Sequence, residues 1–230
     1  MQQIALNVIA IGIFVISLFS MLAPILHISP LVPVVITLFL MAILGIDTGL
    51  LQNRGVSIFL EFIASKEHRQ RVIHHEAGHF LIAYLLDIPV LDYSLSTLEA
   101  WRKGQRGSGG VILNLEQLKS KEAPVTVFDK LYTIWMAGIA AEQIVYQEAQ
   151  GGQDDREQLY ALLQKKGDNK NSYRLKERTA ILQAKDLLKK NSLAYDTIVT
   201  LMEQGSTIEQ CYQSLNLLKA SSNAPQLSLI

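Results

Sequence analysis

The chain has 230 residues, a formal net charge of zero at pH 7 and 49% hydrophobic residues. This length accommodates one domain of ordinary size together with a membrane segment, and the balanced charge argues against a nucleic-acid surface. The single cysteine, Cys211, excludes an internal disulfide framework and a cysteine-rich zinc module, so we interpret it as a buried or idle thiol.

The first fifty residues differ in kind from the rest. Residues 4–26 form a stretch of 23 residues without a charge, and residues 31–46 form a second apolar stretch after the sequence HISP. A membrane-spanning helix needs about 20 predominantly apolar residues, so the first stretch qualifies outright and the second qualifies if it extends past Asp47. A signal peptide is the alternative, but its apolar core has only about 7 to 15 residues and follows positive charge, which the sequence MQQ lacks.

The two stretches predict a two-span membrane anchor over residues 1–51, with its turn at residues 27–30. A juxtamembrane linker is expected over residues 52–64. Positive charge near a span stays on the cytoplasmic side, and basic residues follow the second stretch closely, at Arg54, Lys66, Arg69 and Arg71. We therefore expect an integral membrane protein whose remaining part faces the cytosol, or the stroma or matrix in an organelle.

The part of the chain after the linker is expected to be mainly α-helical. Ser65 is a candidate N-cap, and a helical spacing of apolar residues and histidines predicts a helix that ends before Pro89. Residues 91–97 and 109–115 alternate like strands of a small β-pair, with a polar, Gly-rich connector between them. Further helices are expected over residues 124–147, 155–164, 172–190 and 195–203, and a flexible tail over residues 216–230.

The sequence HEAGH at residues 75–79 is a complete H-E-x-x-H motif. Residues four apart on a helix share a face, so His75 and His79 can bind one Zn²⁺ ion while Glu76 lies beside it. Zinc lowers the pKa of a water molecule that it binds to about 7, and Glu76 is suited to take the proton. A catalytic zinc site usually has three protein ligands, so a third must come from elsewhere. Gly78 costs about 1 kcal/mol inside a helix, which suggests close packing near the metal.

The chain resembles a known protease domain in three stretches and in the β-pair. The stretches are HEAGH, MAGIAAEQIVY at residues 136–146 and GGQDD at residues 151–155. The protease domain is that of the membrane-bound, ATP-dependent zinc metalloproteases of the FtsH type, and the resemblance covers roughly residues 65–200. It implies that Asp155, 76 residues after His79, completes the zinc site. Glu142 is the second candidate, as third ligand or as partner of a ligand. His74 is interpreted as a residue of the helix surface.

The resemblance implies a zinc metalloendopeptidase domain over residues 65–215. His75, His79 and Asp155 would be its ligands, and Glu76 would act first as general base and then as acid. Membrane or unfolded proteins are the expected substrates, bound as an added strand near residues 109–115. The expected partners are a protein or peptide substrate, the membrane, and either FtsH-type ATPase subunits or further copies of this chain, with no nucleic acid.

The chain also departs from this family. Between anchor and protease the family carries an ATPase module, whereas this sequence has no G-x-x-x-x-G-K-[ST] phosphate loop, so ATP-driven unfolding is not expected of it. Residues 137–139 read AGI where the family has G-G-R, and Gln143 replaces a glutamate. These two changes bear on assembly contacts more than on chemistry.

Three alternatives stay open. An intramembrane metalloprotease would carry its motif inside an apolar span, whereas this motif follows the charged sequence SKEHRQR. A non-proteolytic or partner-dependent regulator of full-length FtsH-type proteases fits the missing ATPase module. A metal-free interaction module gives no reason for Glu76.

Overall fold

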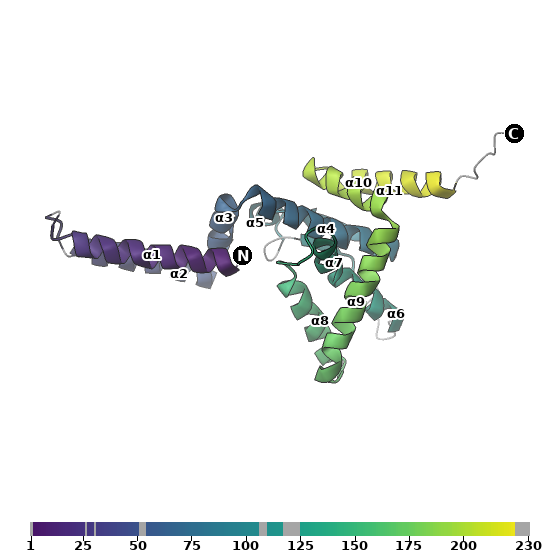
Figure 1. The fold of residues 1–230 in the computed structure, drawn as a ribbon, viewed down its shortest axis with the longest axis horizontal. Helices are drawn as coiled ribbons and strands as arrows, with labels where there is room; N and C mark the ends of the chain where they lie inside the picture. Colours follow the sequence, from purple (N-terminus) through teal and green to yellow (C-terminus); the bar gives the residue numbers. More distant parts are fainter. Residues whose placement is uncertain are drawn as a thin grey trace. The chain divides into compact units, whose positions relative to one another are not determined.

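The computed structural model describes six stretches of the chain, residues 2–25, 27–29, 31–50, 54–105, 110–116 and 125–223. Within these stretches the protein is mainly α-helical with one two-stranded antiparallel sheet, as the sequence predicts. The chain divides into two compact units (Figure 1). The first comprises Met1–Ser65 and Ser96–Gly109, and the second comprises Lys66–Leu95 and Gly110–Ile230.

The first unit begins with two helices that lie side by side, α1 (Gln2–Leu22) and α2 (Leu31–Leu50). Large apolar side chains are exposed along both helices, among them Phe14, Leu18, Met21, Val35, Phe39 and Met41. Over the part of the chain that the structure describes, no helix combines the length and the apolar character needed to cross a membrane.

The predicted linker over residues 52–64 contains a helix, α3 (Arg54–Ile63). Its first turn is capped from α2, because the carboxylate of Asp47 accepts hydrogen bonds from the backbone N–H groups of Gly55, at 2.7 Å, and Val56, at 2.9 Å. A carboxylate at this position satisfies donors that have no partner within the helix. Asp47, which directly follows the second apolar stretch, therefore has a structural role as the cap of α3.

The predicted polar, Gly-rich connector between the two strands also contains a helix, α5 (Thr97–Arg102), which the sequence did not predict. The side chain of Ser96 caps it by accepting a hydrogen bond from the N–H of Glu99 at 3.1 Å. Glu61 of α3 accepts a second one, from the N–H of Thr97 at 2.9 Å. This second cap comes from a residue 36 positions away, which local composition does not show.

The second unit begins with α4 (Lys66–Leu85), which starts directly after Ser65 and ends before Pro89, as predicted. The predicted β-pair is confirmed: β1 (Val90–Ser94) pairs antiparallel with β2 (Gly110–Leu113), and Tyr93 lies opposite Val111. The chain therefore leaves the second unit after β1, forms α5 in the first unit, and returns at β2.

The helix predicted over residues 124–147 is divided into α6 (Val125–Trp135) and α7 (Ala137–Val145). Directly after this interruption at Met136, α7 packs tightly against α4 at Gly78. A Cβ atom added at Gly78 would lie 2.7 Å from the carbonyl oxygen of Ala137 and 2.8 Å from Cβ of Ala141. Gly78 therefore allows two helices to approach closely, which refines the expectation that it packs near a metal.

Three more helices begin two or three residues before their predicted starts: α8 (Gln153–Lys165), α9 (Lys170–Lys190) and α10 (Ser192–Glu203). The residues that precede α8 and α9 agree with the early starts of these two helices. Gly152 precedes α8 in the left-handed region, with φ of 86°, and the side chain of Asn169 accepts a hydrogen bond from the N–H of Asn171 at 3.0 Å at the start of α9.

The prediction of a flexible tail from residue 216 differs from the structure, in which α11 (Ile208–Asn223) continues the second unit. Its apolar face holds it in place, since Cys211 and Leu215, four residues apart, are both buried. Tyr212 also accepts a hydrogen bond from the N–H of Val90 at 2.8 Å. Cys211 is a buried free thiol, as interpreted from the sequence. Residues 224–230 lie outside the described part.

The core of the second unit is built around α4. Phe80, Leu81 and Ile82 have no exposed surface, and they pack with residues of α7, α10 and the β-pair. The H-E-x-x-H motif lies in the middle of α4, directly before Phe80, so one helix provides both the centre of the core and the candidate site.

Candidate metal centre

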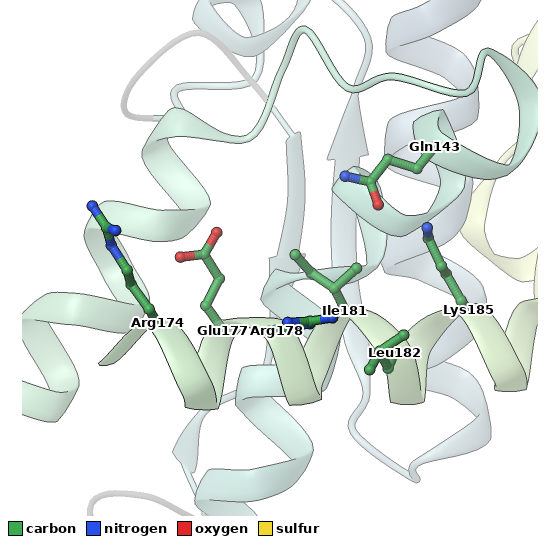
Figure 2. A pocket seen from close by; sticks show the side chains of 7 residues that line it. All are labelled: Gln143, Arg174, Glu177, Arg178, Ile181, Leu182 and Lys185. Carbon is green, nitrogen blue, oxygen red and sulfur yellow. The ribbon is translucent and has the colours of Figure 1, made fainter. Parts of the chain in front are cut away.

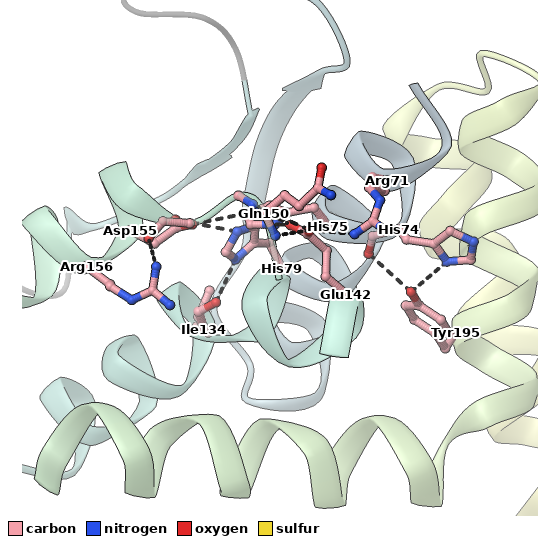
Figure 3. Close-up of polar contacts among 12 residues, drawn as sticks. Arg71, His74, His75, His79, Ile134, Glu142, Gln150, Asp155, Arg156 and Tyr195 are labelled. Atoms are coloured by element: carbon pink, nitrogen blue, oxygen red, sulfur yellow. Dashed lines mark hydrogen bonds and ion pairs between the residues drawn. The ribbon is translucent and has the colours of Figure 1, made fainter. Parts of the chain in front are cut away.

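The two histidines of the motif and one aspartate meet at one point. His75 and His79 lie on one face of α4, with ring centroids 4.7 Å apart. Asp155, in the first turn of α8, faces both rings (Figure 3). Its Oδ2 atom lies 3.0 Å from Nε2 of His75, and its Oδ1 atom lies 3.5 Å from Nε2 of His79.

This arrangement fits a metal ion. One ligand atom from each of His75, His79 and Asp155 lies within 4.8 Å of the others. Two imidazole nitrogens and one carboxylate oxygen form a donor set that zinc accepts in catalytic sites. The structure thus brings together the residue pair suggested by the motif and the aspartate suggested by the resemblance.

Glu142, the second candidate for third ligand, lies on the opposite side of His75. Its Oε1 atom accepts a hydrogen bond from Nδ1 of His75 at 2.7 Å. The backbone N–H of Gln150 holds the other carboxylate oxygen at 2.8 Å, and the N–H of Gly151 bonds to Oε1 at 3.2 Å. A carboxylate in this position fixes the ring orientation of a ligating histidine. Glu142 is therefore arranged as a partner of His75.

His79 is oriented in the same way by the backbone. Its Nδ1 atom donates a hydrogen bond to the carbonyl oxygen of Ile134 at 2.7 Å. With the Nδ1 atoms of both histidines engaged, both Nε2 atoms face Asp155. Sequence spacing predicts that the rings share a face, but these partners come from α6 and α7, about 55 to 67 positions away.

Glu76 lies next to the β-pair. Its Oε2 atom accepts a hydrogen bond from the backbone N–H of Val111 in β2 at 3.0 Å. A Cβ atom at Gly110 would lie 3.5 Å from the same oxygen. Burial raises the pKa of Glu76, and the charges of His79 and His75 oppose this effect only in part. The strand therefore runs directly beside the carboxylate that the motif marks as general base.

The charges within the centre are strongly coupled. Burial alone lowers the pKa of His75, but hydrogen bonds to Asp155 and Glu142 outweigh it and raise this pKa to about 10. Burial also lowers the pKa of His79, and the charge of Asp155 reverses the direction so that it is raised. Burial raises the pKa of Asp155, yet both histidines hold it well below its usual range. A cation that enters the centre must therefore displace protons from the imidazoles.

Glycines allow the close packing around His75. A Cβ atom at Gly138 would lie 2.3 Å from Nε2 of His75, and one at Gly151 would lie 2.7 Å from Oε1 of Glu142. Gly152 adopts a φ of 86° just before α8, which turns the chain toward Asp155. Sequence reasoning did not single out these three glycines as parts of the site, although Gly151 and Gly152 stand in the GGQDD stretch.

His74, interpreted from the sequence as a residue of the helix surface, is only partly exposed. Its Nδ1 atom lies 2.8 Å from the hydroxyl of Tyr195 in α10, away from the metal centre. Arg71, one turn before His75, is buried as well. The sequence suggested for Arg71 only a role in membrane orientation.

A separate groove of about 440 Å³ runs along α9 beside α7 (Figure 2). None of the predicted site residues lines it. Gln143, the residue that departs from the family pattern, points into it next to basic side chains of α9. The lining residues are Gln143, Arg174, Glu177, Arg178, Ile181, Leu182 and Lys185.

Comparison of the chain with protein-family models and with curated proteins gives no match. The resemblance to FtsH-type proteases therefore stays a prediction from the motifs. The case for a function rests on the geometry around His75, Glu76, His79 and Asp155.

Proposed function

We propose that this protein is a zinc metalloendopeptidase that hydrolyses peptide bonds in unfolded or membrane proteins. The observation that carries the proposal is the meeting of His75, His79 and Asp155 in one buried cluster, with Glu76 next to it on α4. The donor types suit zinc, and three protein ligands leave a position open for reaction. When bound, zinc supplies Lewis acidity, which makes a bound water molecule acidic near neutral pH and polarises a carbonyl group.

Glu76 is the proposed general base and acid. Its carboxylate would accept a proton from the attacking water and deliver it to the leaving amine. Burial that raises its pKa supports this role, because an acid and base that works near neutral pH needs a pKa above the ordinary carboxylate value. The N–H of Val111 holds one of its oxygens, so the other is the one available for proton transfer.

The β-pair supports a mode of substrate binding. Val111 of β2 donates its N–H to Glu76, so this strand lies against the carboxylate proposed as general base. An extended peptide that pairs with β2 would run past Glu76, since added strands bind through backbone hydrogen bonds. Such binding is largely independent of substrate sequence, which agrees with unfolded segments as substrates.

The proposal includes a membrane anchor over residues 1–51, the range that contains α1 and α2, although no helix of the described part has by itself the length and apolar character to cross a membrane. It is supported by the exposed apolar side chains along both helices and by the basic residues that follow α2 in the sequence. The second unit would then face the cytosol, or the stroma or matrix. Because the sequence has no phosphate loop, FtsH-type ATPase subunits are the proposed partners for substrates that need unfolding. Further copies of the chain are proposed partners for assembly only.

The test is hydrolysis of unfolded casein without ATP by the full chain in detergent. Glu76→Gln should keep the zinc ligands and reduce the rate at least about 100-fold, because general acid and base catalysis contributes that much or more. Glu157→Gln is the matched control: Glu157 is exposed on α8 and accepts a hydrogen bond from the side chain of Gln153, so the rate of this variant should equal that of the wild type.

Equal rates in Glu76→Gln and the wild type would contradict the assigned mechanism. Zinc without cleavage in the wild type would favour the alternative of a non-proteolytic or partner-dependent regulator, in which the metal has a structural role.

A further inference from the structure

A buried arginine lies one turn before the first candidate ligand. Arg71 is on α4, four residues before His75, and is 9% exposed. A buried charge is costly unless it is paired and hydrogen-bonded. Among the described residues, however, the Nη1 atom of Arg71 has no hydrogen-bond partner. The position of this guanidinium therefore needs an explanation other than surface solvation.

The partners of Arg71 differ in exposure. Its Nη2 atom lies 3.3 Å from Glu67 and 3.9 Å from Glu148, whose side chains are 68% and 69% exposed. Ion pairs with such exposed carboxylates contribute little. Its Nη1 atom lies 3.9 Å from Oε2 of Glu142, whose side chain is only 3% exposed. Charge interactions are screened least in the interior, so Glu142 is the partner on which Arg71 acts most strongly.

Glu142 connects Arg71 with His75. One carboxylate oxygen, Oε2, faces the guanidinium, and the other, Oε1, accepts the hydrogen bond from Nδ1 of His75 at 2.7 Å. The three side chains come from α4 and α7 and follow one another toward the metal centre (Figure 3). The ring of Tyr146 lies 4.2 Å from Cζ of Arg71 and limits the positions that the guanidinium can take.

We infer that Arg71 is a positioning residue of the metal centre, which acts through Glu142 on His75. The guanidinium holds the Glu142 carboxylate in place, and this carboxylate keeps Nδ1 of His75 as the donor and Nε2 directed at Asp155. Partners of this kind set the affinity of a metal site, and their loss typically costs 10- to 100-fold. The inference rests on the metal site of the proposed function but does not depend on peptide hydrolysis.

The experiment is a double-mutant cycle on metal affinity. Dissociation constants for Zn²⁺ are measured by chelator competition in the full chain, for the wild type, Arg71→Gln, Glu142→Gln and the double variant. Each single variant should bind zinc about 10 to 100 times more weakly. Because Arg71 acts through Glu142, the double variant should bind no more weakly than Glu142→Gln alone.

Two controls separate this role from a general contribution to stability. Glu67→Gln and Glu148→Gln remove the exposed partners of Arg71 and should leave zinc affinity unchanged. Arg71→Lys keeps the charge without the planar fork, so it should fold and show an intermediate loss of affinity. The visible absorption of bound Co²⁺ should shift in Arg71→Lys, because the orientation of His75 changes, and stay unchanged in Glu148→Gln.

Wild-type zinc affinity in Arg71→Gln or Arg71→Lys would overturn the inference. The inference would also be overturned if the loss of zinc affinity in the double variant equals the product of the losses in the two single variants, since the two residues would then act independently. Absence of zinc from the wild type would overturn both this inference and the metal site of the proposed function. Zinc binding without casein cleavage would contradict the proposed protease activity, but it would not contradict the role of Arg71 in zinc binding.

Discussion

At His75 both ring nitrogens meet a carboxylate. Nδ1 bonds to Glu142 and Nε2 faces Asp155, in a position from which water is largely excluded. Two carboxylates stabilise the imidazolium, which is why the pKa of His75 rises to about 10 despite burial. A metal ion must compete with that proton, because histidine binds metals in its neutral form.

We expect zinc affinity to rise with pH well beyond the ordinary histidine pKa of 6.5. Below its raised pKa His75 carries a proton in the metal-free protein, and zinc displaces it. Apparent affinity should increase up to about tenfold per pH unit for each proton released. Calorimetry at about pH 8 in two buffers of different ionisation enthalpy counts these protons. Zinc binding without proton release at this pH would contradict the assigned charges. In the variant Glu142→Gln, zinc binding should release fewer protons than in the wild type.

The residues of the site differ in how far the sequence predicts them. His75 and His79 follow from helical spacing, because residues four apart share a face, and Glu76 follows from the H-E-x-x-H motif. Asp155 is suggested only by the resemblance, since local pattern does not show which of the later acids returns to α4. Arg71 could not be predicted, because its burial depends on Glu142 and Tyr146 of α7 and the turn that follows it.

At the level of elements, the contact between α4 and α7 both supports the fold and forms the site. Gly78 of α4 faces Ala137 and Ala141 of α7, and Gly138 of α7 faces the ring of His75. A methyl group at either glycine has no room, but only the second one lies against a candidate ligand.

Gly78→Ala and Gly138→Ala should therefore have different effects. Gly78→Ala should destabilise the metal-free protein by about 1 to 3 kcal/mol through overpacking, although alanine favours a helix by about 1 kcal/mol. Gly138→Ala should in addition abolish zinc binding, because the new Cβ atom would lie 2.3 Å from Nε2 of His75. Thermal unfolding followed by circular dichroism and zinc titration measure the two effects.

The matched control is Gly49→Ala in α2, where an added Cβ atom would meet nothing within 4 Å. The unfolding temperature of this variant should be equal to or higher than that of the wild type. Normal zinc binding in Gly138→Ala would show that His75 does not need its present position.

The sequence predicts the helices and strands whose ends are set by neighbouring residues. It does not predict those that are stabilised by residues far away in the chain. The start of α4 after Ser65 and the two strands follow from capping residues and alternation. By contrast, α5 depends on Glu61 of another helix. The face of α11 that carries Cys211 and Leu215 is buried only by the tertiary fold, and so its polar sequence resembled a tail.

At the level of the whole molecule, the proposed anchor makes a prediction about sidedness. Ser29, in the turn between α1 and α2, and Ser221, in α11, are both exposed. If α1 and α2 cross the membrane, a maleimide that cannot cross it should label Ser29→Cys from outside intact cells and Ser221→Cys only after permeabilisation.

The native thiol gives little background in this experiment. Cys211 is buried, and burial raises the pKa of its thiol to about 11, which leaves almost no reactive thiolate at neutral pH. Labelling of both introduced cysteines from outside, or recovery of the full chain in the soluble fraction, would contradict the anchor.

The central claim is that His75, His79 and Asp155 bind a zinc ion. The most direct measurement is the zinc content of the purified full chain by mass spectrometry, for the wild type, Asp155→Asn and the neighbouring Asp154→Asn, whose side chain is exposed. We predict about one zinc ion per chain in the wild type and in Asp154→Asn, as expected for a single three-ligand site, and a large loss in Asp155→Asn. A wild type without zinc, or equal zinc in Asp155→Asn, would contradict the account.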